Sequence, residues 1–154
     1  MIHGIDTSFL IAMELDEHPS HVAAGIALRR LLAAGDRLAL TPQVLDEFIH
    51  VATDGKRLTH PLGVATAREA AERWWSSADV DHVFPNEEAV SQFFAWIDQF
   101  QFGRKRLLDT MLAATYFHNR VTSILTINPK DFAILGVIQC PSLAPQVSTQ
   151  GPST

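Results

Sequence analysis

The sequence contains a single cysteine, Cys140, so neither a disulfide within the chain nor a cluster of zinc-binding thiolates is possible. It also lacks a long apolar run. Asp6 and Glu14 interrupt the apolar amino terminus, which has no basic segment of the kind that opens a secretory signal. These absences exclude thiol redox proteins and zinc fingers. They predict a protein without a membrane segment, compatible with a reducing cytoplasm.

Positive charge is scarce as well. The chain has 12 Lys and Arg residues against 17 Asp and Glu residues, which gives a formal net charge of −5. Because an acidic protein repels a polyanion, any binding of nucleic acid must depend on a local basic cluster or on bound cations. The HExxH, GxSxG, Walker A and GxGxxG patterns are all missing, which leaves no motif for a zinc protease, a serine hydrolase or a nucleotide-binding loop.

Short apolar segments alternate with helical patterns along most of the 154 residues. Strands are predicted over residues 2–5, 37–40, 80–84, 123–126 and 137–139. After a helix that follows the first strand, further helices are predicted over residues 21–34, 41–53, 64–77, 86–100, 107–119 and 129–135. Because parallel neighbours need crossover connections, this order predicts a three-layer α/β/α sandwich with a mostly parallel central sheet. We expect one domain over residues 1–140 and a disordered tail over 141–154, which is rich in Pro, Ser, Thr and Gln.

Polar side chains follow two of these predicted strands. Asp6 comes directly after the first strand, and Asn128 closely follows the strand over 123–126. Ligand sites in open parallel sheets form where the carboxyl ends of the strands meet, so both residues are candidates for a site. On its own, Asp6 is equally compatible with a role as the cap of the helix that follows.

Two further acids lie within predicted helices. Asp109 lies on a largely apolar helix face, where an isolated carboxylate would cost several kcal/mol unless a cation, a proton or the helix amino terminus stabilised it. Glu47 lies at the boundary of an apolar face, whereas Asp46 points about 100° away around the same helix. A helix cap for Asp109 and a surface position for Glu47 are the alternatives.

As a set, four segments resemble the signature of the PIN-domain family, and in particular of its VapC-type toxins. They are IDTSFL, TPQVLDEF, LLDTMLAAT and ILTINPKDF, and the resemblance extends over nearly the whole chain to about Cys140. It implies that Asp6, Glu47 and Asp109 converge at the carboxyl edge of the sheet and bind Mg²⁺ or Mn²⁺. It also implies a set of residues that support the site by hydrogen bonding, namely Thr7, Ser8 and Thr126.

The fourth position of that signature departs from the commonest pattern. Many PIN domains carry aspartate where this chain has Asn128, and an amide can ligate a metal only through a neutral oxygen. Asn128 followed by Pro129 is also a typical helix start, with Asp131 in the place of a capping-box acid. We therefore expect three metal-binding carboxylates, with Asn128 or Asp131 as a possible further ligand.

The resemblance implies an endoribonuclease that leaves a 5′-phosphate and a 3′-hydroxyl. It also implies a homodimer and a VapB-type antitoxin as partner. Hard divalent cations prefer oxygen ligands, and Mg²⁺ keeps several waters that can serve as nucleophiles. The basic run Arg104, Lys105 and Arg106 precedes the helix of Asp109 and could hold a substrate phosphate, although an exposed basic turn explains it equally well.

Several other features keep more than one interpretation open. His50 and His118 could line the site, but partly exposed helix histidines are the simpler interpretation. Aromatic side chains crowd two predicted helices and indicate either core packing or an interface: Trp74, Trp75, Phe93, Phe94, Trp96, Phe100 and Phe102. Two alternative functions remain, namely a PIN fold with a failed metal site that binds RNA or protein, and a housekeeping nuclease of RNA processing.

Overall fold

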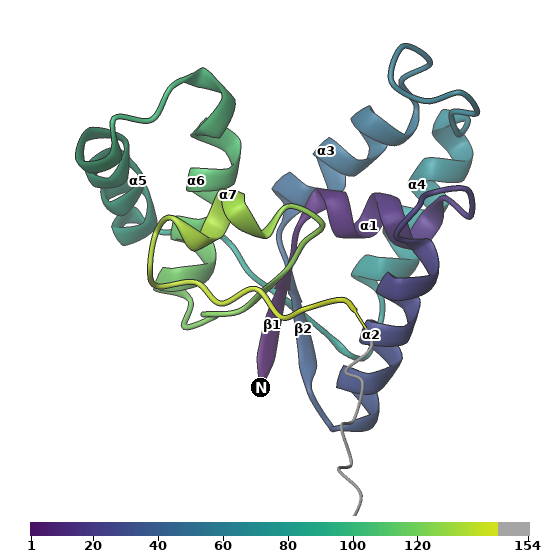
Figure 1. The fold of residues 1–154 in the computed structure, drawn as a ribbon, viewed down its shortest axis with the longest axis horizontal. Helices are drawn as coiled ribbons and strands as arrows, with labels where there is room; N and C mark the ends of the chain where they lie inside the picture. Colours follow the sequence, from purple (N-terminus) through teal and green to yellow (C-terminus); the bar gives the residue numbers. More distant parts are fainter. Residues whose placement is uncertain (145–154) are drawn as a thin grey trace, which may run out of the picture.

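The structure is a computed structural model, and it describes residues 1–144. Short strands alternate with helices along the chain, as the sequence predicts (Figure 1). The elements are β1 (Ile2–Ile5), α1 (Thr7–Glu14), α2 (His21–Ala33), β2 (Arg37–Leu40), α3 (Pro42–Ala52), α4 (Val64–Trp75), β3 (Val80–His82), α5 (Glu87–Phe100), a short 3₁₀ helix η1 (Arg104–Arg106), α6 (Leu107–His118), β4 (Ile124–Leu125) and α7 (Pro129–Ala133).

The four strands form one sheet in the order β3-β2-β1-β4, and every neighbouring pair is parallel. Helices α1 to α4 lie on one side of the sheet and α5 to α7 on the other, which confirms the three-layer α/β/α prediction (Figure 1). Because the strands are parallel, their carboxyl ends share one edge. The residues that directly follow β1 and β4 therefore lie close together.

The predicted strand over 137–139 is wrong. Within the described residues this segment contributes only an isolated parallel bridge between Gln139 and Ser123. Gly136, at a φ of 71°, turns the chain just before the segment, and Pro141 follows it closely, so few residues are left in extended register. The predicted strands over 80–84 and 123–126 are also shorter in the structure, because they end at His82 and Leu125.

Side-chain caps mark the starts of α3 and α5. Thr41 accepts a hydrogen bond from the Val44 amide, and Asn86 accepts one from the Ala89 amide at 2.8 Å. Ser20 stands at the amino terminus of α2, but its side chain makes no capping bond there. The start of α3, and with it the position of Glu47, is therefore fixed by a local signal in the sequence.

Tyr116 of α6 packs against Gly4 in the middle of β1. A Cβ atom on Gly4 would lie 2.6–2.8 Å from carbons of the tyrosine ring. The buried hydroxyl accepts a hydrogen bond from the Ile5 amide at 3.0 Å and lies within donating distance of the Ile5 and Ala39 carbonyls. Burial raises the pKa of this hydroxyl far above its usual range. Tyr116 therefore links α6 to β1 and β2 by hydrogen bonds to their backbones. The Ile5 contact lies directly before Asp6.

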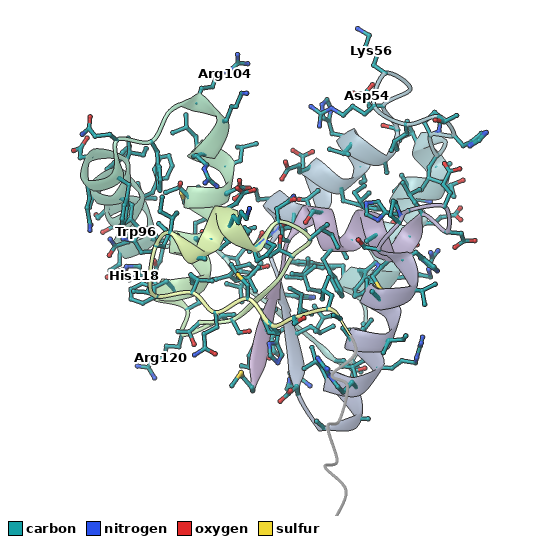
Figure 2. All side chains as sticks on the ribbon, viewed as in Figure 1. Asp54, Lys56, Trp96, Arg104, His118 and Arg120 are labelled. Carbon is teal, nitrogen blue, oxygen red and sulfur yellow. The ribbon has the colours of Figure 1, made fainter. Side chains whose placement is uncertain are left out.

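The aromatic residues of α4 and α5 mostly pack within the domain. Trp96 of α5 is buried against α6 (Figure 2). The Trp75 ring stacks on His82 with ring centroids 3.6 Å apart, whereas Phe94 is 60% exposed. Of the predicted tail, residues 141–144 lie along the domain and Leu143 packs against the core, while residues 145–154 lie outside those that the structure describes. No described helix is long and apolar enough to span a membrane.

Candidate active site

A cavity of about 330 Å³ opens at the carboxyl edge of the sheet. Its lining comes from the residues that follow β1 and β4 and from the helices on both sides of the sheet. It comprises Asp6, Thr7, Ser8, Ile11, His18, Glu47, Val51, Asp109, Ile127, Asn128 and Asp131. The structure therefore brings the three acids singled out in the sequence into one cavity, together with both residues named as possible further ligands.

Asp6 is held by hydroxyl groups from two strand ends. Its Oδ2 accepts hydrogen bonds from Ser8 Oγ at 2.5 Å and from Thr126 Oγ1 at 2.8 Å. The same hydroxyls also accept hydrogen bonds from backbone amides. The Ile127 amide donates to Ser8 Oγ and the Asn128 amide donates to Thr126 Oγ1, each at 3.0 Å. The Asp6 side chain makes no capping bond to α1. Ser8 and Thr126 contact it as the resemblance implies, and their supporting role at a metal site remains a prediction.

Glu47 reaches the cavity from α3. Its Oε2 accepts a hydrogen bond from Thr7 Oγ1 at 2.8 Å, which orients the carboxylate from the first turn of α1. Asp46 is exposed and does not line the cavity, in agreement with the helical geometry. An ionised carboxylate offers about four lone-pair sites, so this hydrogen bond leaves most of the accepting capacity of Glu47 free.

Burial and nearby negative charges perturb the pKa of Asp109. Desolvation, followed by the nearby charges of Asp6, Asp131 and Glu47, raises the pKa of Asp109 to about 7, although Arg106 acts in the opposite direction. Burial likewise raises the pKa of Asp6, against the lowering effect of the hydrogen bonds from Ser8 and Thr126. Several carboxylates thus share a poorly hydrated space and repel one another, an arrangement that a cation would relieve.

Neither Asn128 nor Asp131 makes the helix-capping hydrogen bond that its position in the sequence indicates. Asn128 makes no side-chain capping bond and lines the cavity, while Asp131 forms an ion pair with Arg106. Arg106 also lies over the Phe102 ring, with its guanidinium carbon 6.0 Å from the centroid. One member of the predicted basic run is therefore engaged with an acid of the cavity. Arg104 and Lys105 are exposed and do not line the cavity, and Arg104 points outward from the segment just before the amino end of α6 (Figure 2).

An Arg106→Gln substitution is expected to raise the pKa of Asp109 further, because it removes a nearby positive charge and leaves Asp131 without its partner. Carbon-13 NMR titration of the Asp109 carboxyl group would measure this shift. Arg104→Gln is the matched control and should leave the titration unchanged. Equal effects of the two substitutions would show that the ion pair with Asp131 has no special influence.

The histidine that lines the cavity is not one considered in the sequence. His50 is exposed on α3, and His118 lies beside α5 in a separate hollow with Gln92, so the simpler interpretation of both is confirmed (Figure 2). His18 lines the cavity from the turn between α1 and α2. That turn has no helical periodicity from which its orientation could be deduced.

The donor set fits a hard divalent cation. The polar lining consists mainly of carboxylate, hydroxyl and amide groups, which are the ligands that Mg²⁺ and Mn²⁺ prefer. Within residues 1–144, no three His, Cys, Asp or Glu side chains are arranged to hold an ion entirely by themselves. Such a shell is not required, since Mg²⁺ is usually bound through one or two carboxylates and keeps several of its waters.

Comparison with solved structures reveals VapC-type folds. VapBC-1 of nontypeable Haemophilus influenzae has a TM-score of 0.65 and 19% identity, covering 93% of this chain and 98% of that chain. VapC20 of Mycobacterium tuberculosis, a toxin that cleaves the sarcin-ricin loop, has a TM-score of 0.64 and 20% identity, covering 90% and 98%. VapBC2 of Rickettsia felis, bound to a promoter DNA fragment, has a TM-score of 0.64 and 15% identity, covering 92% and 98%.

Among curated proteins, a sequence comparison finds no significant match. The sequence profile of the PIN domain, in contrast, matches residues 5–136, which span β1 to the turn after α7 and include every acid of the cavity. Fold, order of the acidic residues and family profile therefore agree, and the chain belongs to the PIN-domain family.

Proposed function

We propose that this PIN-domain protein is an endoribonuclease that depends on Mg²⁺ or Mn²⁺. The observation that carries the proposal is the convergence of Asp6, Glu47, Asp109 and Asp131 on one cavity, where the pKa of Asp109 rises to about 7. Clustered acids with perturbed pKa values in a cleft are typical of functional sites rather than of packing. Of the three functions that the sequence leaves open, a PIN fold with a failed metal site is the least compatible with this cluster of acids.

Each part of the cavity has a role in this proposal. Asp6, Glu47 and Asp109 would hold the cation, with the amide oxygen of Asn128 as a further ligand. When bound, the cation supplies Lewis-acid activation of water and neutralises the negative charge that develops on the phosphoryl oxygens. Ser8 and Thr126 fix the orientation of Asp6, and Thr7 fixes that of Glu47, so the ligands are oriented before substrate arrives.

The proposal is tested by incubating purified protein with a pool of structured RNA in Mg²⁺ or Mn²⁺, with and without EDTA. Cleavage should require the metal, and Glu47→Gln should reduce it by at least about tenfold, because the substitution keeps the shape and removes one ligand charge. Asp46→Asn, on the same helix but outside the cavity, is the matched control and should remain active. Cleavage that persists in EDTA, or that Glu47→Gln leaves unchanged, would contradict the proposal.

The proposal extends to a role as the toxin of a VapBC-type pair, acting in the cytoplasm as a homodimer under the control of a VapB-type antitoxin. The similarity to VapBC complexes and to VapC20 supports this role over that of a housekeeping nuclease. Expression of the wild-type chain should arrest bacterial growth, and Asp6→Asn should abolish the arrest. Co-expression of a small protein encoded directly upstream should also relieve it, and that protein should copurify with the chain. Growth arrest that Asp6→Asn leaves intact would contradict the toxin role.

A further inference from the structure

His18 is the only His, Lys or Arg side chain in the lining of the acidic cavity, as far as residues 1–144 are concerned. It is half-buried on the turn that joins α1 to α2. Backbone hydrogen bonds fix this turn on both sides, from the His18 amide to the Leu15 carbonyl and from the His21 amide to the His18 carbonyl, each at 2.9 Å. The imidazole therefore has a defined position beside the acids.

The hydrogen bonding of the ring fixes its tautomer. The Ser20 amide donates a hydrogen bond to His18 Nδ1 at 3.0 Å, which requires that Nδ1 carry no proton. In the neutral ring the proton then lies on Nε2, and no other group in residues 1–144 forms a hydrogen bond with that atom. A protonated Nε2 cannot ligate a metal, so the ring presents a neutral hydrogen-bond donor.

His18 and Asp6 reach the cavity from opposite ends of α1. The turn of His18 follows the carboxyl end of α1, whereas Asp6 precedes the amino end of that helix. Between them, Ile11 and Val51 line the cavity one helical turn, about 5.4 Å, beyond Ser8 on α1 and Glu47 on α3 respectively. The lining thus includes, besides the acids, apolar side chains further along α1 and α3 and a nitrogen donor beyond the carboxyl end of α1.

We infer that His18 contacts the RNA, with its Nε2–H donating a hydrogen bond to a phosphate oxygen of a nucleotide that flanks the scissile bond. This inference rests on the proposed ribonuclease function and adds a substrate-binding residue to it. Clustered carboxylates repel a phosphate. The Nε2–H donor of His18, in the same cavity, offsets part of that repulsion. Ile11 and Val51, which also line the cavity, offer apolar contacts to the sugar or base of that nucleotide.

The test measures the affinity for an RNA containing the cleavage site, in an Asp109→Asn background that does not cut it. His18→Leu should weaken binding about tenfold, the usual effect of losing a hydrogen bond to a charged group. His18→Gln, which retains an N–H donor of similar reach, should bind within about threefold of the parent. His50→Leu, which removes an exposed histidine of α3, is the matched control and should have no effect.

Two results would overturn the inference while the folded state is maintained, as checked by thermal unfolding. One is equal affinity of His18→Leu and the parent, and the other is a loss in His18→Gln as large as that in His18→Leu. Nitrogen-15 NMR of the ring should show the Nε2–H tautomer and a shift of Nε2 on addition of RNA; the opposite tautomer would also overturn it. Failure of the ribonuclease proposal is distinguishable, since it appears as wild-type protein that cleaves no RNA in the presence of metal.

Discussion

Asp109→Asn protein is expected to lose RNA cleavage by at least about 100-fold and yet to unfold at higher urea concentration than the wild type when both are free of metal. The first effect follows because the substitution removes one of the charges that would hold the cation. The second follows because the same charge is repelled by Asp6, Asp131 and Glu47 in a poorly hydrated cavity. Activity and stability should therefore change in opposite directions, which is typical of a functional site.

The pH dependence of stability has a definite sign. The pKa of Asp109 is about 7 in the folded chain, above the value of about 4 expected in the unfolded chain, so the folded state binds protons more tightly. Its contribution to the free energy of unfolding is full below about pH 4 and is lost as the pH rises through about 7. Burial raises the pKa of Asp6 too, so some pH dependence of the same sign should remain in the Asp109→Asn variant.

Urea unfolding at a series of pH values measures this difference. The wild type and Asp109→Asn should be equally stable near pH 4, and the variant should exceed the wild type by about 1–2 kcal/mol near pH 8. This figure is well below the full effect of the pKa shift, because water screens a partly exposed carboxylate. Asp98→Asn, an exposed site on α5, is the control and should show no such divergence. Parallel curves for wild type and Asp109→Asn would rule out the proposed repulsion.

Gly4→Ala is expected to destabilise the domain by about 3 kcal/mol and to lower the melting temperature by about 6–12 °C. The added Cβ would lie 2.6 Å from the nearest ring carbon of Tyr116, a contact that real structures do not tolerate. Relief would require movement of the buried ring, whose hydroxyl bonds the backbone of Ile5. Because Asp6 directly follows Ile5, the same movement should reduce cleavage by protein that remains folded.

Gly103→Ala provides the comparison for this substitution. Gly103 has a negative φ and no atom near the position of a Cβ, so alanine should be tolerated there within about 0.5 kcal/mol. Thermal unfolding of the two variants side by side separates the loss of a glycine from the collision with Tyr116. If both variants melted with the wild type, the close packing of α6 on β1 would not be essential to the fold.

Each acid singled out in the sequence has a local signal, but none of these signals points to a metal site by itself. Asp6 and Asn128 follow buried strands, and Thr41 with Pro42 fixes the start of the helix that presents Glu47. Asp109 stands out because a carboxylate on an apolar helix face needs a compensating partner. Parallel strands bring Asp6 and Asn128 to one sheet edge, whereas the convergence of Glu47 and Asp109 on that edge is implied only by the resemblance of the four segments to the PIN-domain signature.

The features that the sequence does not predict all depend on contacts between distant segments. The ion pair of Arg106 with Asp131 joins two elements that are unrelated in sequence pattern, and it engages a residue assigned to phosphate binding. His18 lies on a turn without periodicity, and its ring orientation depends on the amide of Ser20. The segment over 137–139 has the composition of a strand, but its neighbouring turns limit it to one bridge.

Binding of Mn²⁺ to the metal-free chain, followed by electron paramagnetic resonance, tests most directly the claim that the acid cavity is a metal site. Wild type and Asp46→Asn should bind Mn²⁺ with equal affinity, whereas Asp6→Asn and Asp109→Asn should each bind at least about tenfold more weakly. Substoichiometric or equally weak binding in all four proteins would contradict the account. It would leave the cluster of Asp6, Glu47 and Asp109 as a site without a cation.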